Sequence, residues 1–181
     1  MRLKEKYQKE ILPKLKKEFN FKNDYVAPRL TQVVINVGFG SHAKEKEYQQ
    51  NIADNLTKIT GQKPVFTLAK KSVSAFKIRE GMTIGAKVTL RGDRMYDFVE
   101  KLVNITFPRV RDFRGISEKA VDSTGNLTIG IKDQAAFPEL KVEDIVSNFG
   151  LEICLSTSTK NRAEGLELFR LLGFPFKKDS K

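Results

Sequence analysis

The feature that most constrains the fold of this chain is a regular alternation of apolar and polar residues in several short segments. Residues 31–39 read TQVVINVGF and residues 85–91 read GAKVTLR, and segments 127–131 and 151–158 alternate in the same way. A period of two residues is that of a β-strand with one dry and one wet face. Strands of this kind need a cover on one face only, so we expect the other face of their sheet to stay open.

Helical periodicity fills the spaces between these strands. Apolar residues recur three and four positions apart, as they do on the buried side of an amphipathic helix. The segments with this spacing are 3–19, 48–59, 95–105 and 166–172, and a short helix is also expected at 142–149.

Residues at the ends of these segments carry start and stop signals. Pro13 is expected to kink or restart the first helix, and Gly61 occupies a C-terminal cap position. Asp93 is expected to cap the next helix and Pro108 to end it. Asn161, followed three residues later by a glutamate, has the pattern that opens the last helix.

The order of these elements predicts the fold class. With the short apolar run PVFTL at 64–68, the chain reads strand, helix, strand, strand, helix, strand, strand, helix. This order does not alternate as a doubly wound parallel sheet requires, and its two hairpin-like successions favour an antiparallel or mixed sheet. We therefore predict an α+β fold, a single domain over residues 1–181, with a mainly antiparallel sheet whose helices pack on one face. The open face is expected to carry Asn36, Lys87, Thr89, Arg91, Thr128 and Ser156.

The charge of the chain favours a polyanionic partner. Lys and Arg number 33 against 22 Asp and Glu, which gives a net charge of +11. The excess is concentrated, because residues 63–94 contain eight basic and two acidic residues, whereas residues 120–158 contain two basic and six acidic ones. This asymmetry predicts one basic side, although a generally basic, solvated surface is the alternative.

The basic window contains a loop, residues 68–85, with the sequence LAKKSVSAFKIREGMTIG. Its cations would repel one another if they were packed together, and Gly81 and Gly85 allow it to flex. We expect residues of about 69–85 to be mobile in the free protein and to become ordered on RNA.

Signals of catalysis are weak. The turn GFGSHA at 38–43 matches the spacing of a dinucleotide-binding turn, but no acidic residue ends the following strand, and a long loop interrupts the sheet it would need. Gly38 and Gly40 are better explained by a backbone turn or a close approach to RNA. The single histidine, His42, and the single cysteine, Cys154, cannot form a triad or a metal site, so we expect neither enzyme activity, nor a cofactor, nor a bound metal.

Targeting signals are also missing from the sequence. No apolar run approaches the ~20 residues that span a membrane, and the first twelve residues alternate charged and apolar side chains, unlike a secretory signal. We expect a cytoplasmic protein without a membrane partner. Peripheral attachment through the N-terminal helix is a weaker alternative.

Several longer blocks resemble one protein family. In order along the chain they are APRL at 27–30, INVGFG at 35–40, TGQKPVFTLAKKSVSAFKIREGMTIGAKVTLRGDRMYDF from residue 60, FPRVRDFRGIS from residue 107 and LLGFPFK at 171–177. Their sequence and spacing are similar to those of bacterial large-subunit ribosomal protein number five over essentially the whole chain.

This resemblance implies a structural protein of the large ribosomal subunit. The family binds 5S rRNA and attaches it in the central protuberance, where 23S rRNA and other large-subunit proteins are its neighbours. A projecting loop contacts P-site tRNA, and another region contacts small-subunit ribosomal protein number thirteen in an intersubunit bridge.

The family pattern also implies which residues make these contacts. The 5S rRNA-binding blocks match Asn36, Gln62, Lys63, Thr67, Lys70, Lys71, Thr89 and Arg91. The tRNA-contacting loop matches Ser74, Phe76, Lys77, Arg79 and Met82. Bridge or RNA contacts are expected from Arg109, Arg111 and Arg114.

One block departs from the family. Where its members read D-G-R-G-N, residues 122–126 of this chain read DSTGN and lack the arginine. An anion contact at this loop is therefore not carried over to this chain.

Overall fold

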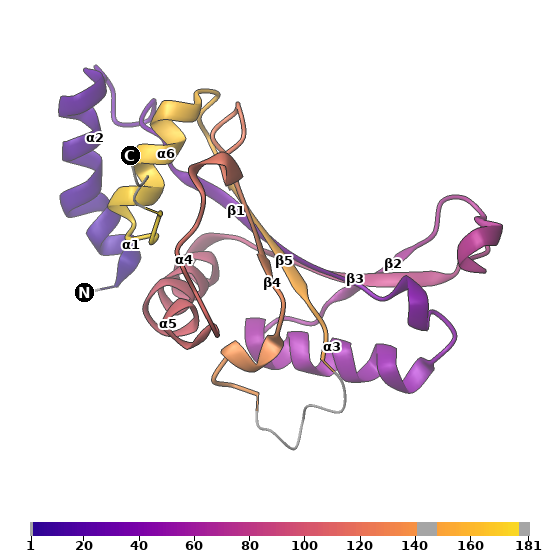
Figure 1. Cartoon of the computed structure of the whole chain (residues 1–181). Helices are drawn as coiled ribbons and strands as arrows, with labels where there is room; N and C mark the ends of the chain where they lie inside the picture. Colours follow the sequence, from indigo (N-terminus) through magenta and orange to yellow (C-terminus); the bar gives the residue numbers. More distant parts are fainter. Residues whose placement is uncertain (1, 141–147, 178–181) are drawn as a thin grey trace. The chain divides into compact units, whose positions relative to one another are not determined.

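A computed structural model describes residues 2–140 and 148–177 of the chain (Figure 1). The helix expected at 142–149 lies almost entirely outside the described residues. Within these described residues, five strands form one sheet with the order β2-β3-β1-β5-β4. They are β1 (Leu30–Gly38), β2 (Val65–Leu68), β3 (Thr83–Leu90), β4 (Leu127–Ile131) and β5 (Leu151–Thr157).

The sheet is antiparallel, and with its helices it confirms the predicted α+β class. In the pairing of β2 with β3, Val65 lies opposite Lys87 and Thr67 lies opposite Gly85. Both predicted hairpin-like successions are adjacent in the sheet, because β2 neighbours β3 and β5 neighbours β4. The short run at 65–68 is therefore an edge strand.

The chain divides into two compact units, and the division falls within β1, β3, β4 and β5. The first unit comprises 1–33, 90–129 and 154–181, and the second comprises 34–89 and 130–153.

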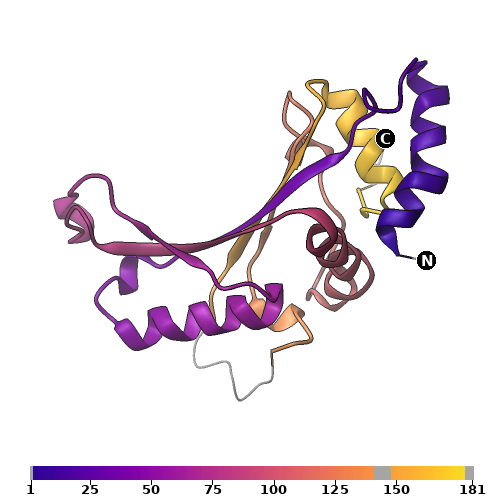
Figure 2. The same cartoon turned by 180° about the vertical axis from the view of Figure 1, so that it is seen from behind.

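In the second unit, one long helix, α3 (Lys46–Thr60), accompanies the strands (Figures 1 and 2). It buries Ile52, Leu56 and Ile59, and the strands bury alternate residues such as Ile35 and Val88. Gly61 ends the helix as predicted: its φ of 67° is left-handed, and its N–H donates to the carbonyl of Thr57 at 2.8 Å.

The first unit begins with a helix that Pro13 restarts, as the sequence predicts. A short turn, α1 (Leu3–Lys6), passes into the π-helical segment η1 (Tyr7–Ile11) and then into α2 (Leu12–Phe19). Proline has no N–H to donate, so it fits the first turn of α2. The π-helical segment just before it accommodates the change in hydrogen bonding.

Two predicted helix ends in this unit are wrong. Asp93 does not cap α4 (Gly92–Lys101), because Arg91 holds the cap position, and the carboxylate of Asp93 instead accepts a 2.5 Å hydrogen bond from Lys4. Pro108 does not end the helix either: the chain continues through η4 (Leu102–Thr106) into α5 (Phe107–Arg109), with the proline in the first turn of α5.

The last helix, α6 (Arg162–Leu171), begins as predicted, because the side chain of Asn161 accepts a hydrogen bond from the N–H of Ala163 at 3.0 Å. The core of this unit includes an aromatic cluster. Phe174 lies edge-on to Phe107 and Phe169, with ring centroids 6.0 and 5.3 Å away. Among the residues described, no helix is both long and apolar enough to cross a membrane.

Candidate nucleic-acid interface

The second unit has an open sheet face of polar residues. On β3, exposed Lys87 and half-buried Thr89 alternate with the buried Ala86, Val88 and Leu90. The alternation arises because successive side chains of a strand point to opposite faces, and only one face is packed.

The neighbouring strands add an amide and a hydroxyl to this face. Asn36 is half-buried between the buried Ile35 and Val37 of β1. Thr67 of β2 is also half-buried, and it lies opposite Gly85 in the β2–β3 register. Amides, hydroxyls and ammonium groups are the side-chain groups that contact phosphate and sugar oxygens.

Gln62 and Lys63 connect α3 to this face. The side-chain amide of Gln62 donates to the carbonyl of Thr89 at 3.3 Å, so the segment just after the helix is tied to β3. Lys63 is exposed and precedes β2 by two residues. The Gln62 bond holds the predicted residues 62 and 89 together.

Arg91, the remaining residue predicted to bind 5S rRNA, belongs to the first unit. It is exposed, and its guanidinium donates to the side-chain oxygen of Gln32 at 2.7 Å. The face predicted for this unit also carries Thr128, which is exposed, and Ser156, which is half-buried. The strand alternation is therefore as predicted in this unit too.

The basic loop, residues 69–82, is built as an extension of the β2–β3 hairpin. The N–H of Ala69 donates to the carbonyl of Met82 at 2.8 Å, and the N–H of Gly81 donates to the carbonyl of Ala69 at 3.0 Å. Farther out, Val73 and Ile78 exchange two backbone hydrogen bonds, of 2.9 and 3.1 Å. The side chains of Lys70 and Lys71 are exposed between these two closures.

The tip of the loop is a single 3-10 turn, η3 (Ser74–Phe76), followed by a left-handed Lys77 with φ of 53°. The Phe76 ring is 73% exposed, which is unusual for a phenylalanine and leaves it free to stack on a base. Arg79 is exposed, while its backbone N–H donates to the sulfur of half-buried Met82 at 3.1 Å.

Gly85 does not act as the flexible hinge that the sequence predicts. It lies within β3, and a Cβ atom there would stand 2.7 Å from the hydroxyl oxygen of Thr67 and 2.8 Å from the carbonyl oxygen of Val37. Its glycine identity therefore permits three strands to approach closely. Gly81, by contrast, has the left-handed φ of 80° that suits a turn.

The basic residues of this interface form no ion pairs within the part of the chain that the structure describes. Among the described residues, no acidic side chain forms an ion pair with the cations of the face and loop, which are Lys63, Lys70, Lys71, Lys77, Arg79 and Lys87. Their positive charge is therefore available to a partner.

The predicted bridge arginines lie at the end of α5 and on the irregular segment that follows it in the first unit. Arg109, Arg111 and Arg114 are all exposed. The segment is anchored by Phe113, whose ring stacks on Phe107 at a centroid distance of 5.1 Å. One aromatic side chain thus packs on the unit while the guanidinium groups remain outside.

The 122–126 loop, which lacks the family arginine, is folded around a carboxylate. One oxygen of Asp122 accepts hydrogen bonds from the N–H groups of Thr124 and Asn126, at 2.9 and 2.7 Å. Desolvation by burial acts to raise the pKa of Asp122, but these bonds and those from the Asn126 and Thr124 side chains outweigh it and lower the pKa below its usual value. This carboxylate stabilises the loop itself.

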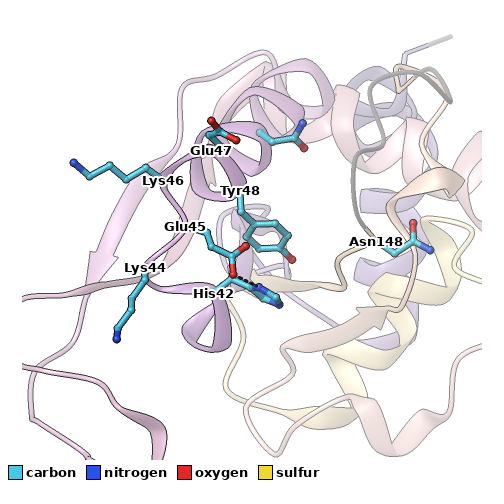
Figure 3. Close-up of a pocket in the computed structure, with 8 residues that line it drawn as sticks. His42, Lys44, Glu45, Lys46, Glu47, Tyr48 and Asn148 are labelled. Carbon is cyan, nitrogen blue, oxygen red and sulfur yellow. Dashed lines mark hydrogen bonds and ion pairs between the residues drawn. The ribbon is translucent and has the colours of Figure 1, made fainter.

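The glycine turn at 38–43 does not form a dinucleotide site. It leads from β1 into the 3-10 turn η2 (Gly40–His42), and the sheet around it is antiparallel rather than parallel. His42 lies at the surface, where its ring contacts Tyr48 and its Nδ1 atom is 3.1 Å from Oε1 of Glu45 (Figure 3). Within the ranges 2–140 and 148–177, no group of three or more His, Cys, Asp or Glu residues could hold a metal ion.

An open polar sheet face lies beside a basic loop whose cations form no ion pairs among the described residues. This combination is typical of the class of proteins that bind a polyanion. Two family models match the chain and identify the family. One describes ribosomal protein L5 and matches residues 23–79, and the other describes the C-terminus of the same ribosomal family and matches residues 83–176. The chain belongs to the ribosomal protein L5 family.

Individual relatives agree with this assignment. The chain is 52% identical over 176 residues to large ribosomal subunit protein uL5 of Helicobacter pylori strain 26695, covering 97% of both chains. The corresponding protein of Desulfatibacillum aliphaticivorans is 52% identical, over 97% of this chain and 98% of the relative. That of Halothermothrix orenii is 49% identical, over 96% and 97%.

Family membership decides between the classes that the sequence left open. The resemblance to large-subunit ribosomal protein number five is confirmed, and with it the prediction of a structural protein rather than an enzyme.

Proposed function

We propose that this protein, as a structural component of the large ribosomal subunit, binds 5S rRNA with its open sheet face and attaches that RNA in the central protuberance. Its place of action is the ribosome, in the cytoplasm. We also propose that it contacts 23S rRNA and other large-subunit proteins in the central protuberance. In this proposal residues 1–181 act as one RNA-binding domain.

The observation that carries the proposal is the placement of the predicted 5S rRNA-binding residues. In the second unit, Asn36 and Thr89 alternate with buried apolar residues, so they lie on the wet side of their strands. Lys70 and Lys71 extend from the same β2–β3 hairpin and have no acidic partner among the residues described. Hydroxyls and amides position a sugar-phosphate backbone, while the cations supply most of the affinity.

The loop is proposed to contact P-site tRNA through Ser74, Phe76, Lys77, Arg79 and Met82. Its cations suit phosphates, and the exposed ring at residue 76 suits a base or a ribose. We also propose that the loop moves as a unit in the free protein, because the hydrogen bonds described for residues 69–82 join loop residues to one another.

The exposed arginines at 109, 111 and 114 are proposed to contact the small subunit, at ribosomal protein number thirteen, in an intersubunit bridge. The stacked pair of Phe107 and Phe113 supports this role by holding the segment while its guanidinium groups stay exposed. Arginine forms bidentate contacts to carboxylates and phosphates, so the segment suits an acidic protein surface or RNA.

The experiment that tests the main proposal compares two double variants in 5S rRNA footprinting and filter binding. Lys70→Glu with Lys71→Glu removes two proposed phosphate contacts, so binding should weaken strongly and the slope of log K against log salt should fall by about 1.4 to 1.8. Lys14→Glu with Lys17→Glu, on exposed positions of α2, makes the same change in net charge and should retain the footprint. Equal losses from both double variants, or no loss from the first, would refute the proposed face.

A further inference from the structure

A hollow beside the basic loop is lined in part by a basic residue, Lys44, that lies outside the loop and is not among the predicted site residues. It is lined by Lys44, Ser72, Ser74, Lys77, Ile78, Arg79 and Met82. All but the first of these residues belong to the loop, while Lys44 comes from the turn that follows β1. The hollow therefore joins two segments of the second unit that are well separated in sequence.

The turn that carries Lys44 is fixed to the base of the loop. The N–H of Phe39 donates to the carbonyl of Ile84 at 2.9 Å, at the start of β3. From there the turn closes on itself, because the N–H of His42 donates to the carbonyl of Phe39, and the N–H of Glu45 to the carbonyl of His42. Backbone hydrogen bonds thus hold Lys44 beside the hairpin from which the loop extends.

The Lys44 side chain is directed away from its acidic neighbour. Figure 3 shows Glu45 turned toward His42, whereas Lys44 points away from both. The Nδ1 atom of His42 lies 3.1 Å from Oε1 of Glu45, which engages that carboxylate. Lys44 forms no ion pair with any acidic side chain that the structure describes.

The lining of the hollow matches the chemistry of an RNA backbone. Three exposed cations, Lys44, Lys77 and Arg79, surround it, and no acidic residue of the described chain lines it. The hydroxyl oxygen of Ser72 accepts the N–H of Glu80 at 2.9 Å, which leaves its proton free to donate.

Apolar atoms of the hollow favour a nucleotide over a bare anion. Ile78 and Met82 are half-buried, and the Cδ1 atom of Ile78 packs close to Gly40. Such a surface suits a ribose, while cations and hydroxyls take its phosphates. The exposed ring of Phe76 on the same loop can stack a neighbouring base.

We propose that Lys44 completes a phosphodiester-binding site with Lys77 and Arg79, so that an RNA strand is held between the loop and the turn after β1. The proposal rests on the proposed function, because it assigns the loop to RNA. It adds a residue outside the loop to that contact. The RNA could be rRNA or tRNA, and the two sources share the same phosphodiester chemistry.

The test compares Lys44→Gln with Lys46→Gln in the full-length protein. Lys46 is also exposed and begins α3 shortly afterwards, but it does not line this hollow. Binding of a tRNA transcript and of a 5S rRNA transcript is measured separately between about 0.05 and 0.3 M salt, where phosphate contacts dominate the salt dependence. Thermal melting checks that both variants are folded.

Loss of one phosphate contact should lower the salt slope for one of the two RNAs by about 0.7 to 0.9, which corresponds to about five- to eightfold weaker binding at 0.1 M salt. The RNA that shows this loss identifies the source of the strand, and Lys46→Gln should leave both affinities unchanged.

Equal behaviour of the two variants on both RNAs overturns the role of Lys44. If Lys77→Gln and Arg79→Gln still weaken binding in that case, the loop assignment survives and only this inference fails. If the loop variants and the Lys70→Glu, Lys71→Glu variant all bind like the unaltered protein, the proposed function fails as well.

Discussion

Replacing Gly85 with alanine is expected to destabilise the protein through the close approach of three strands. A Cβ atom at this position would lie 2.7 Å from the hydroxyl oxygen of Thr67 and 2.8 Å from the carbonyl oxygen of Val37. Ordinary van der Waals contact begins near 3.4 Å, so each neighbour would have to move by about 0.6 Å or more. The threonine can rotate, but the carbonyl belongs to β1, the middle strand of the sheet.

The expected cost follows from these two contacts. Inserting a methyl group into a packed site costs about 1 to 3 kcal/mol. The lower entropy of an unfolded chain with alanine returns about 0.4 to 1 kcal/mol. The middle of the two ranges gives a net loss of about 1.3 kcal/mol. For a chain of this length, each kcal/mol lowers the melting temperature by about 2 to 4 °C, which gives a decrease of about 3 to 5 °C.

Gly38→Ala is the matched control for this prediction. Gly38 lies in the same unit, at the end of β1, and a Cβ atom there would meet nothing within 4 Å. Its substitution should therefore stabilise the protein by about 0.4 to 1 kcal/mol, because only the lower entropy of the unfolded chain contributes. Thermal melting followed by circular dichroism measures both variants. An unchanged melting temperature for Gly85→Ala, or an equal decrease for Gly38→Ala, would show that close strand packing does not explain the glycine.

Two further predictions concern titratable groups. Asp122→Asn should reduce stability by about 1 kcal/mol at pH 7, because it removes the charge that accepts hydrogen bonds in its loop. Because the folded-state pKa of Asp122 is lowered, this stabilisation is present above the unfolded value of about 3.9 and is lost as the pH falls through the folded value; urea titrations in which the variant's deficit were as large at pH 2 as at pH 7 would contradict it. Burial, and to a smaller extent the nearby Tyr96, raises the pKa of Tyr7 to about 12. The stabilisation from its neutral form is therefore present below the unfolded-state pKa of about 10 and is lost as the pH rises through the folded-state pKa of about 12. Tyr7→Phe leaves the carbonyl of Pro28 without the 3.0 Å hydrogen bond and should cost about 1 to 2 kcal/mol at pH 7, with a smaller difference above pH 11; an unchanged midpoint in urea at pH 7 would refute this.

Much of the secondary structure could be predicted from local sequence. The alternation in 31–39 and 85–91 predicts strands that differ from β1 and β3 by at most two residues at each end. Gly61 and Asn161 cap their helices as predicted, because a cap depends on conformations and side chains within one turn. The cap predicted at Asp93 is wrong because its carboxylate bonds to Lys4, which is distant in sequence.

The site could be predicted in part. The residues assigned to the open face, such as Asn36 and Thr89, have the burial expected from a period of two. The contact between Gln62 and the carbonyl of Thr89 could not be predicted, because it depends on where α3 ends relative to β3. The position of Lys44 could not be predicted for a similar reason: nothing in its local sequence places it beside a loop that begins at residue 69.

The sequence by itself determined the strand and helix periods, the concentration of positive charge in residues 63–94 and the family to which the chain belongs. These properties are local or additive, since they depend on neighbouring residues or on sums over them. Only the tertiary structure decided that Gly85 serves close packing, that Asp122 stabilises its own loop, and that Lys44 lies beside the basic loop. Those roles depend on distances between segments that folding brings together, and no local pattern records such distances.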